Sequence, residues 1–296
     1  DVELIYTGHY YQRRHVRNSV LSCLYQGQDA AIKIYDDPRQ DFEPSSLVAF
    51  HEHNKSELLT APKVFAWEEL TPQQGWVLME RLPEGAKRYE QMLGPNERKE
   101  FLDLFREYRK HFPSEPTREL TLTERLPADE FSINRLNYWH RLATLCEYKE
   151  FMASGERSVD PTVLTDLFVR TVAVMRKVLA GRKMVWCHGH FKGHEVFKAG
   201  GNQFFLIDFA HTAMFPEGYE LAFMVWADYL NAPNNFEMDF AEWVKGVDAW
   251  MDELRPLSEE LGIRDAGMVL EASVLERAVA CILADVMATD RPMEEK

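Results

Sequence analysis

The stretch of residues 186–211 carries most of the side chains in this sequence that could perform chemistry. It reads WCHGHFKGHEVFKAGGNQFFLIDFAH and contains four histidines, one glutamate and one aspartate. Two short apolar segments, Val196–Lys198 and Phe204–Ile207, flank a Gly-Gly-Asn turn and predict a β-hairpin. A hairpin brings its two outer ends together, so polar groups just outside the strands should share one edge. The residues expected at that edge are His188, His190, Glu195 and Asp208.

Two kinds of chemistry fit such a cluster. Imidazoles and carboxylates ligate zinc, and a carboxylate fixed at the end of a strand is also a suitable magnesium ligand for phosphoryl transfer. The cluster alone leaves both possibilities open, together with that of an ordinary polar loop. The zinc ligands would be His188, His190, His194 and His211, with Asp208 or Glu195.

The segments before residue 83 that must help to position this cluster are short and strand-like. A turn at Gly27-Gln28-Asp29 joins two of them, and a helix opened by Ser45 should run to Leu59. The expected strands are Val2–Tyr6, Ser19–Gln26, Ala30–Tyr35, Lys63–Trp67 and Gly75–Arg81.

From Pro83 onwards the apolar residues recur with the 3.6-residue period of amphipathic helices. We therefore predict an α+β protein with a small β-rich lobe at residues 1–82 and a larger, mainly helical lobe at residues 83–296. The expected helices cover residues 96–112, 129–152, a segment opened by Asp160-Pro161, and residues 217–231, 236–254 and 264–288.

Composition narrows the class of protein further. The chain has 34 basic and 48 acidic residues, a net charge of −14, which disfavours binding to nucleic acid. Its four cysteines are scattered without a CxxC pair, which is typical of reduced thiols in the cytoplasm. No apolar run approaches the roughly 18 residues of a membrane span. The chain begins at Asp1, so an initiator Met or a leader could have been removed.

Taken in order, several segments resemble the protein-kinase-like superfamily, above all its aminoglycoside phosphotransferase and choline kinase branch. HGHFKGHEVF at 188–197 resembles the catalytic loop of that branch, written HGDxxxxN, and LIDFA at 206–210 resembles its metal-binding segment. The resemblance implies a bilobal protein-kinase-like fold with ATP between the lobes and an acceptor pocket in the helical lobe. Weaker matches are AIK at 31–33 to the lysine strand, VLMERL at 77–82 to the strand before the hinge, and GYELA at 218–222 to G-x-Y-D-L-A.

The resemblance also implies a role for each matching residue. Lys33 would hold the nucleotide phosphates and pair with Glu52, with Glu57 as a second candidate, and Asp208 would bind Mg²⁺. The backbone groups of Glu80 and Leu82 would contact the adenine edge. The residues expected to support the site without reacting are His188, Glu220 and Trp226.

The catalytic loop departs from the family pattern at two positions. His190 stands where the branch has its catalytic Asp, and Glu195 stands where it has a metal-binding Asn. One carboxylate is lost and one is gained, which favours a retained divalent cation on Asp208 and Glu195. His190, or a water that it orients, would then be the candidate base.

The nucleotide-covering loop departs as well. It contains a single glycine, Gly8, so backbone approach to phosphates is restricted, and arginine side chains are the alternative contacts. The candidate arginines are Arg13, Arg14 and Arg17.

These features predict an ATP-dependent phosphotransferase that acts on a hydroxyl of an amino-sugar, an amino-alcohol or a sugar. A pseudokinase that binds a nucleotide or a partner without transfer is the first alternative, because the usual Asp is missing. A zinc hydrolase that uses His188, His190 and His194 is the second. The sequence gives no indication of the oligomeric state.

Overall fold

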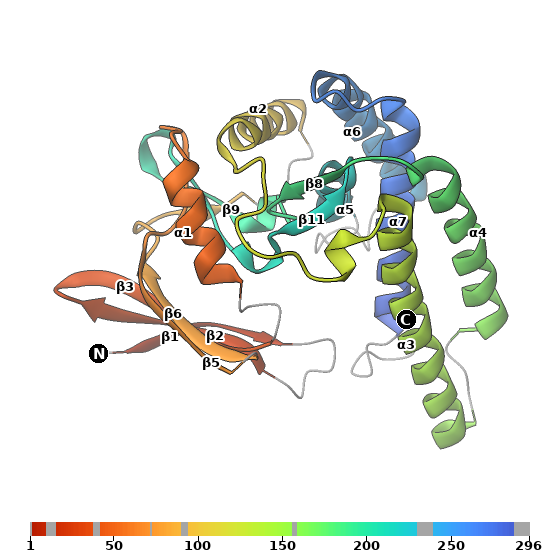
Figure 1. The fold of residues 1–296 in the computed structure, drawn as a ribbon, viewed down its shortest axis with the longest axis horizontal. Coiled ribbons are helices and arrows are strands. Elements are labelled where there is room, and N and C mark those ends of the chain that lie inside the picture. Colours follow the sequence, from red (N-terminus) through yellow and green to blue (C-terminus); the bar gives the residue numbers. More distant parts are fainter. Residues whose placement is uncertain are drawn as a thin grey trace.

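The protein consists of a small antiparallel sheet and a larger helical lobe (Figure 1). The computed structural model describes residues 2–9, 16–37, 42–71, 73–89, 94–155, 159–229 and 239–286. Arg13 and Arg14 of the first loop lie outside these residues.

The small lobe is built on a five-stranded sheet with the order β1-β2-β3-β6-β5, and neighbouring strands in it run antiparallel. All five expected strands are confirmed. The turn between β2 and β3 consists of Gln26 and Gly27, both with positive φ (52° and 81°), because a two-residue hairpin turn requires that conformation. It therefore begins one residue before the expected turn. The strands are β1 (Glu3–His9), β2 (Val16–Tyr25), β3 (Gln28–Asp36), β5 (Val64–Thr71) and β6 (Gln74–Glu80).

Helix α1 (Glu43–His53) connects this sheet to the larger lobe. It begins two residues before the expected start and ends well before Leu59. The helix stops because Asn54 is extended and its side chain accepts a hydrogen bond from the Ser56 amide (3.1 Å), which turns the chain. The chain then forms β4 (Leu59–Thr60), which pairs in parallel with β10 (Phe204–Leu206) of the larger lobe.

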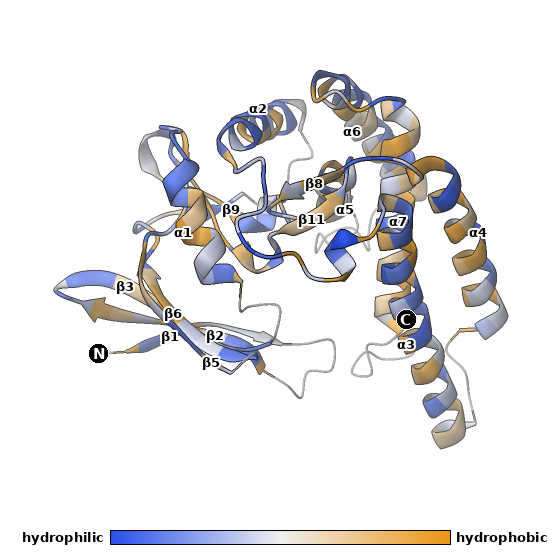
Figure 2. Ribbon diagram, viewed as in Figure 1, coloured by the Kyte–Doolittle hydropathy of each residue, from blue (hydrophilic) through white to orange (hydrophobic). Residues whose placement is uncertain are grey.

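The helices of the larger lobe follow the predicted periodicity, with ends shifted by up to six residues. In Figure 2 hydrophobic and hydrophilic residues alternate along them, as expected of amphipathic helices. Among the described helices, none combines the length and apolar character needed to cross a membrane. The helices are α2 (Pro95–His111), α3 (Ala128–Ser154), α4 (Pro161–Leu179), α5 (Tyr219–Tyr229), α6 (Phe240–Glu260) and α7 (Ala266–Val286).

Short strands at the centre of this lobe position the polar loops. The expected hairpin is confirmed: β9 (Val196–Lys198) runs antiparallel to β10, and its outer side pairs with β7 (Lys87–Arg88). A second pair, β8 (Met184–Cys187) with β11 (Ala213–Pro216), has no counterpart in the sequence-based prediction. Residues 188–195 connect β8 to β9, and residues 207–212 connect β10 to β11. The two strand pairs therefore hold these segments side by side.

Phe50 of α1 joins the two lobes through aromatic contacts. It is fully buried, and its ring lies 5.2 Å from that of Phe209 and 6.0 Å from that of Phe112, between ring centroids. Phe209 directly follows Asp208, so this packing also fixes the chain next to the aspartate.

Replacing Phe50 by Ala should lower the free energy of unfolding by about 3–5 kcal/mol, because a large ring leaves a cavity at the junction of the lobes. Urea denaturation followed by circular dichroism measures the change. Leu24→Ala, at a side chain that is 67% exposed, is the control and should change the same quantity by about 0.5 kcal/mol or less. Equal effects of the two substitutions would contradict the role of Phe50.

Candidate active site

Lys33 of β3 lies between two carboxylates, one from each lobe. Its Nζ is 2.6 Å from Oε2 of Glu43 and 3.2 Å from Oδ1 of Asp208. The Lys33 side chain is 8% exposed and that of Glu43 is 3% exposed. Burial by itself would lower the pKa of Lys33, but the two carboxylates outweigh it and raise that pKa above its ordinary value. Lys33 is therefore a permanently charged ammonium group.

The partner of Lys33 on α1 is Glu43, whereas the sequence predicted Glu52. Glu52 and Glu57 are exposed and make no contact with Lys33. The difference arises because α1 begins at Glu43, so its first turn faces the lysine. The pair Glu43-Pro44 is a typical helix start, with an acidic residue in the first turn and proline at an early position, and could have revealed this.

Asp208 follows β10 in a strained backbone conformation, with φ 60° and ψ 56°. Its Oδ1 faces Lys33, and its Oδ2 lies 3.9 Å from Nε2 of His211. Burial would raise the pKa of Asp208, but the Lys33 ammonium and the neighbouring histidines outweigh burial and hold it well below the usual range. The carboxylate is ionised at neutral pH.

A cleft of about 970 Å³ opens between the lobes at this contact. Such a volume lies in the range of small-molecule and cofactor sites. Of the lining residues, Glu80 donates its backbone N–H to the carbonyl of Lys63 (2.8 Å), so that N–H is already engaged. Arg17 lines the cleft but is already paired with Asp37 (2.7 Å). Besides Arg17, the sequence-predicted residues that line this cleft are Lys33, Glu80, Leu82, His194, Glu195 and Asp208.

Glu195 lies at the end of a short helical turn (Gly193–Glu195) and also faces the cleft. Burial raises its pKa and the charge of Asp208 adds to this, while Lys192 opposes it. The Lys192 Nζ is 3.2 Å from Oε1 of Glu195. Lys192 was not singled out from the sequence, and its position two residues after His190 is the only signal that could have found it.

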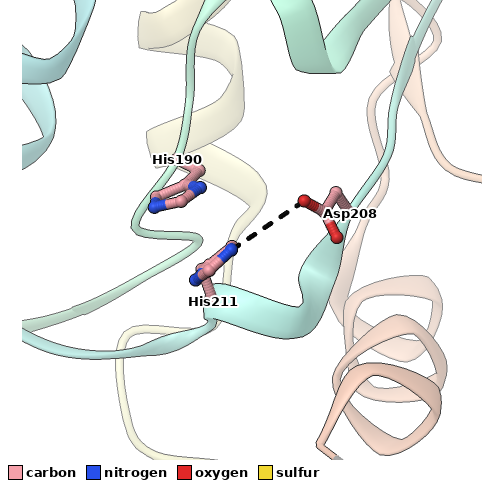
Figure 3. Close-up of side chains that lie close together, drawn as sticks. All are labelled: His190, Asp208 and His211. Atoms are coloured by element: carbon pink, nitrogen blue, oxygen red, sulfur yellow. Dashed lines mark ion pairs between the residues drawn. The ribbon is translucent and has the colours of Figure 1, made fainter. Parts of the chain in front are cut away.

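His190 is held in a stack of rings (Figure 3 shows it beside His211 and Asp208). Its ring centroid is 3.5 Å from that of His211 and 4.5 Å from that of Phe223, with interplanar angles of 23° and 26°. Burial lowers the pKa of His190 well below 6.5, and the nearby charges of His211, Lys192 and Arg277 add to the effect. The ring is therefore neutral and is a weaker proton acceptor than the sequence suggested.

Hydrogen bonds from His188 and Gly189 fix the loop just before His190. The fully buried ring of His188 donates from Nε2 to the carbonyl of Ile207 (2.9 Å), and burial lowers its pKa to about 4. Gly189 has φ 80°, and a Cβ there would approach the His211 carbonyl to 2.6 Å, so only glycine fits. Its amide donates to Glu220 (2.8 Å). These contacts are of the supporting kind expected for His188 and Glu220.

The histidines do not form the set anticipated for zinc. The ring of His188 is engaged with the backbone of the next segment, and His194 faces the cleft. Within the part of the chain that the structure describes, the group able to hold a metal consists of His190, Asp208 and His211, whose ligand atoms all lie within 4.8 Å of one another.

Replacing Lys33 by Met should lower the free energy of unfolding at neutral pH by about 3–5 kcal/mol, because it leaves buried carboxylates without their cation. The folded-state pKa of these carboxyls would then exceed the unfolded value. A group of this kind stabilises the fold when protonated, and that stability is lost as pH rises through the folded pKa.

In the wild type the pH dependence is opposite for Asp208. Its pKa is lowered in the folded state, so it stabilises the fold at pH values above its unfolded-state pKa. The stability difference between wild type and Lys33→Met should therefore shrink as pH falls from neutral towards about 4. Urea unfolding at a series of pH values measures it, with Lys63→Met, at an exposed lysine, as the control. A difference that stays constant with pH would contradict the buried pairing.

Comparison with known proteins agrees with this geometry. The sequence profile of the phosphotransferase enzyme family, APH, matches residues 25–257. Ethanolamine kinase from Plasmodium vivax has a similar structure, with a TM-score of 0.58 and 13% identity over 100% of this chain and 79% of that one. A thermostable mutant of aminoglycoside phosphotransferase APH(4)-Ia, in a ternary complex with ADP and hygromycin B, aligns with a TM-score of 0.54 and 11% identity over 99% of this chain and 95% of that one. No curated protein sequence matches the chain.

The structural neighbours confirm the bilobal, kinase-like α+β fold that the sequence predicted. The sequence profile covers more than three quarters of the chain and includes Lys33, the loop at 188–195 and Asp208. The chain therefore belongs to the phosphotransferase enzyme family.

Proposed function

We propose that this enzyme transfers the γ-phosphoryl group of ATP to a hydroxyl group of a small molecule in the cleft between its lobes. The observation that carries the proposal is the 3.2 Å contact between Lys33 and Asp208 at that cleft. A fixed ammonium and a fixed carboxylate on facing walls suit a nucleotide with its cation, because phosphoryl transfer depends mostly on positioning and charge. The APH(4)-Ia structure with ADP and hygromycin B supports a nucleotide and a small acceptor in this fold.

We assign nucleotide binding to residues 1–82, and the catalytic loop and acceptor pocket to residues 83–296. Lys33, fixed by Glu43, holds the phosphates, and the adenine edge meets the Glu80 carbonyl and the backbone of Leu82. Glu43 takes the role that the family resemblance implied for Glu52. The cytoplasm remains the proposed compartment, which agrees with the absence of a disulfide among the four cysteines.

Asp208 and Glu195 both line the cleft and offer carboxylate oxygens, so they fit a divalent cation such as Mg²⁺. When bound, the cation supplies neutralisation of phosphate charge. Oδ1 of Asp208 is engaged by Lys33, and Oδ2 lies 3.9 Å from Nε2 of His211. Lys192 offsets the charge of Glu195 and lies on the same wall of the cleft.

In the proposed transfer, the acceptor hydroxyl oxygen forms a bond to the γ-phosphorus of ATP as the bond to the bridging oxygen of ADP breaks. The hydroxyl proton leaves to water. Because the reaction passes through a loose transition state, orientation of the hydroxyl matters more than a strong base. His190 is neutral and is stacked between the rings of His211 and Phe223, so it is suited to orienting the acceptor hydroxyl. A zinc hydrolase is not proposed, since the family is one of phosphotransferases.

The test separates a working enzyme from a pseudokinase. Calorimetric titration with ATP and MgCl₂ or MnCl₂ should show one nucleotide per chain, and Lys33→Met should abolish that binding. ADP release is then measured with a panel of hydroxyl acceptors. Binding followed by acceptor-dependent ADP release supports transfer, whereas binding without any release makes the protein a pseudokinase, and no binding overturns the proposal.

Replacing His190 by Ala should lower kcat at least about 100-fold while ATP affinity stays within a factor of about two, because His190 does not line the nucleotide cleft. Steady-state ADP release and calorimetry measure the two quantities. An unchanged kcat would remove His190 from the catalytic site, and a matching loss of ATP affinity would place it in the nucleotide site.

The surroundings of His190 favour an acceptor that is neutral or anionic over a cationic amine. Arg277 lies over the Phe223 ring (4.6 Å from Cζ to centroid), and Lys192 lies 5.3 Å from the same ring. The Arg277 guanidinium donates to the hydroxyl of Tyr219 (2.9 Å), and its buried Nε has no hydrogen-bond partner among the described residues. No described carboxylate lies within ion-pair distance of Arg277. A sugar or a sugar phosphate therefore fits this side better than an amino-alcohol.

The acceptor panel should accordingly contain neutral sugars, sugar phosphates, an aminoglycoside and ethanolamine, with the first two classes turned over fastest. Arg277→Met should raise the KM of the best acceptor about ten- to a hundred-fold, the effect of losing one charged hydrogen bond. Arg277→Lys should restore part of it, and Arg255→Met, at an exposed arginine, should change nothing. Fastest turnover of an amine with no effect of Arg277→Met would refute this preference.

A further inference from the structure

Arg118, in the segment that connects α2 to α3, touches two chain segments of the site at once. Its Cζ lies 3.9 Å from the centroid of the Phe42 ring, and Phe42 directly precedes Glu43. Its Nη2 donates a hydrogen bond to the carbonyl of Thr212 (3.0 Å), in the segment that follows Asp208. Both segments that supply a carboxylate to the buried lysine therefore meet the same guanidinium group.

The guanidinium of Arg118 is held in one orientation by a buried acid. Its Nη1 and Nη2 lie 2.9 Å and 2.8 Å from the two carboxylate oxygens of Glu124. A pair of parallel hydrogen bonds of this kind fixes the plane of the guanidinium. The side chains of Arg118 and Glu124 are 11% and 6% exposed, and the Thr121 amide and hydroxyl donate to the same carboxylate (2.9 Å and 2.8 Å). Arg118 thus presents a fixed flat face to Phe42.

Phe42 stands at the start of α1, where a side chain that accepts a hydrogen bond from the helix is usually found. Phenylalanine has no such group, and among the described residues no side chain caps this helix start. The Phe42 carbonyl accepts hydrogen bonds from the Ser46 amide (3.0 Å) and the Ser45 hydroxyl (3.1 Å), so the position of Phe42 sets that of the first turn. The contact with Arg118 compensates for the missing cap, because a cation over an aromatic ring is attracted more strongly where water is scarce.

We propose that Arg118 is a positioning residue that fixes the first turn of α1 against the segment following Asp208. It thereby holds Glu43 in its 2.6 Å contact with Lys33. Helix ends fray easily, and fraying of this turn would withdraw Glu43 from the lysine. The inference rests on the proposed function only for the use of Lys33 in nucleotide binding, since the positioning is a property of the nucleotide-free chain.

The first test measures hydrogen–deuterium exchange of the Ser46 amide by NMR on the full chain without nucleotide. Phe42→Leu should speed this exchange about three- to thirty-fold, because leucine keeps apolar bulk but lacks the ring that Arg118 contacts. Phe42→Tyr keeps the ring and should exchange at the wild-type rate. Amides in the middle of α6 are the internal reference and should exchange at an unchanged rate, which separates a local effect from a global loss of stability.

Arg118→Met should speed exchange of the Ser46 amide by a similar factor. The double variant of Arg118→Met with Phe42→Leu should exchange no faster than the faster single variant, because both substitutions remove the same contact. Arg125→Met is the matched control in the same connecting segment. The Arg125 side chain is 54% exposed, and its substitution should leave the exchange rate unchanged.

The second test is calorimetric titration with ATP and MgCl₂. Phe42→Leu should weaken ATP affinity at least about three-fold, whereas Phe42→Tyr should stay within a factor of about two of the wild type. The KM of the best acceptor should stay within a factor of about two in both variants, because the contact acts on the nucleotide side. A merely structural weakening would change both quantities together.

The proposal is overturned if Phe42→Leu retains the wild-type Ser46 exchange rate or ATP affinity, or if Phe42→Tyr speeds exchange as much as Phe42→Leu does. It is also overturned if the effects of Arg118→Met and Phe42→Leu multiply in the double variant. Should Arg118→Met fail to fold because Glu124 is left buried without its cation, the two Phe42 variants decide, since both keep Arg118. Failure of the proposed function would look different: the wild type would bind no ATP while the exchange pattern held.

Discussion

The buried ammonium of Lys33 is the interaction on which the rest of the structure depends. It joins three elements that are distant in sequence: strand β3, the first turn of α1 and the end of β10. A charge with so little access to water is stable only beside carboxylates, and a carboxylate with so little access to water needs the ammonium. The two lobes must therefore meet at this point, and the cleft between them lies where the charges do.

Apolar packing next to the Lys33 ion pairs fixes the positions of the two carboxylates. Phe50 packs one face of α1 against Phe209, which directly follows Asp208. The helix that supplies Glu43 therefore also fixes the aspartate. Strand β4, which is part of the small lobe in sequence, pairs with β10 of the large one. The lobes are thus linked by backbone, ring and charge contacts within a few residues of each other, which favours small motions of the sheet over separation of the lobes.

The sequence was most informative where one local signal decides the outcome. Alternating and 3.6-residue patterns located the five strands of the sheet and the helices of the large lobe, and the order of short motifs located Lys33 and Asp208. It was least informative where tertiary contact decides. Glu43 was missed because a helix start can shift by two residues at almost no local cost, and the β8–β11 pair was missed because its strands are short and far apart in sequence. The low pKa of His190 arises first from burial, to which the Phe223 ring contributes, and the charges of His211, Lys192 and Arg277 add to it. No pattern within the loop reveals that burial.

Compared with the loop pattern that the sequence resembles, residues 188–195 carry their charge at different positions. The family pattern places a carboxylate at position 190, yet this chain has a neutral ring there, stacked between His211 and Phe223. The carboxylate at position 195 lines the cleft and is paired with Lys192. Under the proposed function, this places the negative charge on the nucleotide side instead of the acceptor side, while Arg277 adds positive charge beside Phe223. A cationic acceptor would meet repulsion where the family pattern offers attraction, and an anionic one would meet the reverse. If the proposed function holds, His190 and Glu195 together form one coordinated change in the acceptor and cation chemistry and are not two independent losses.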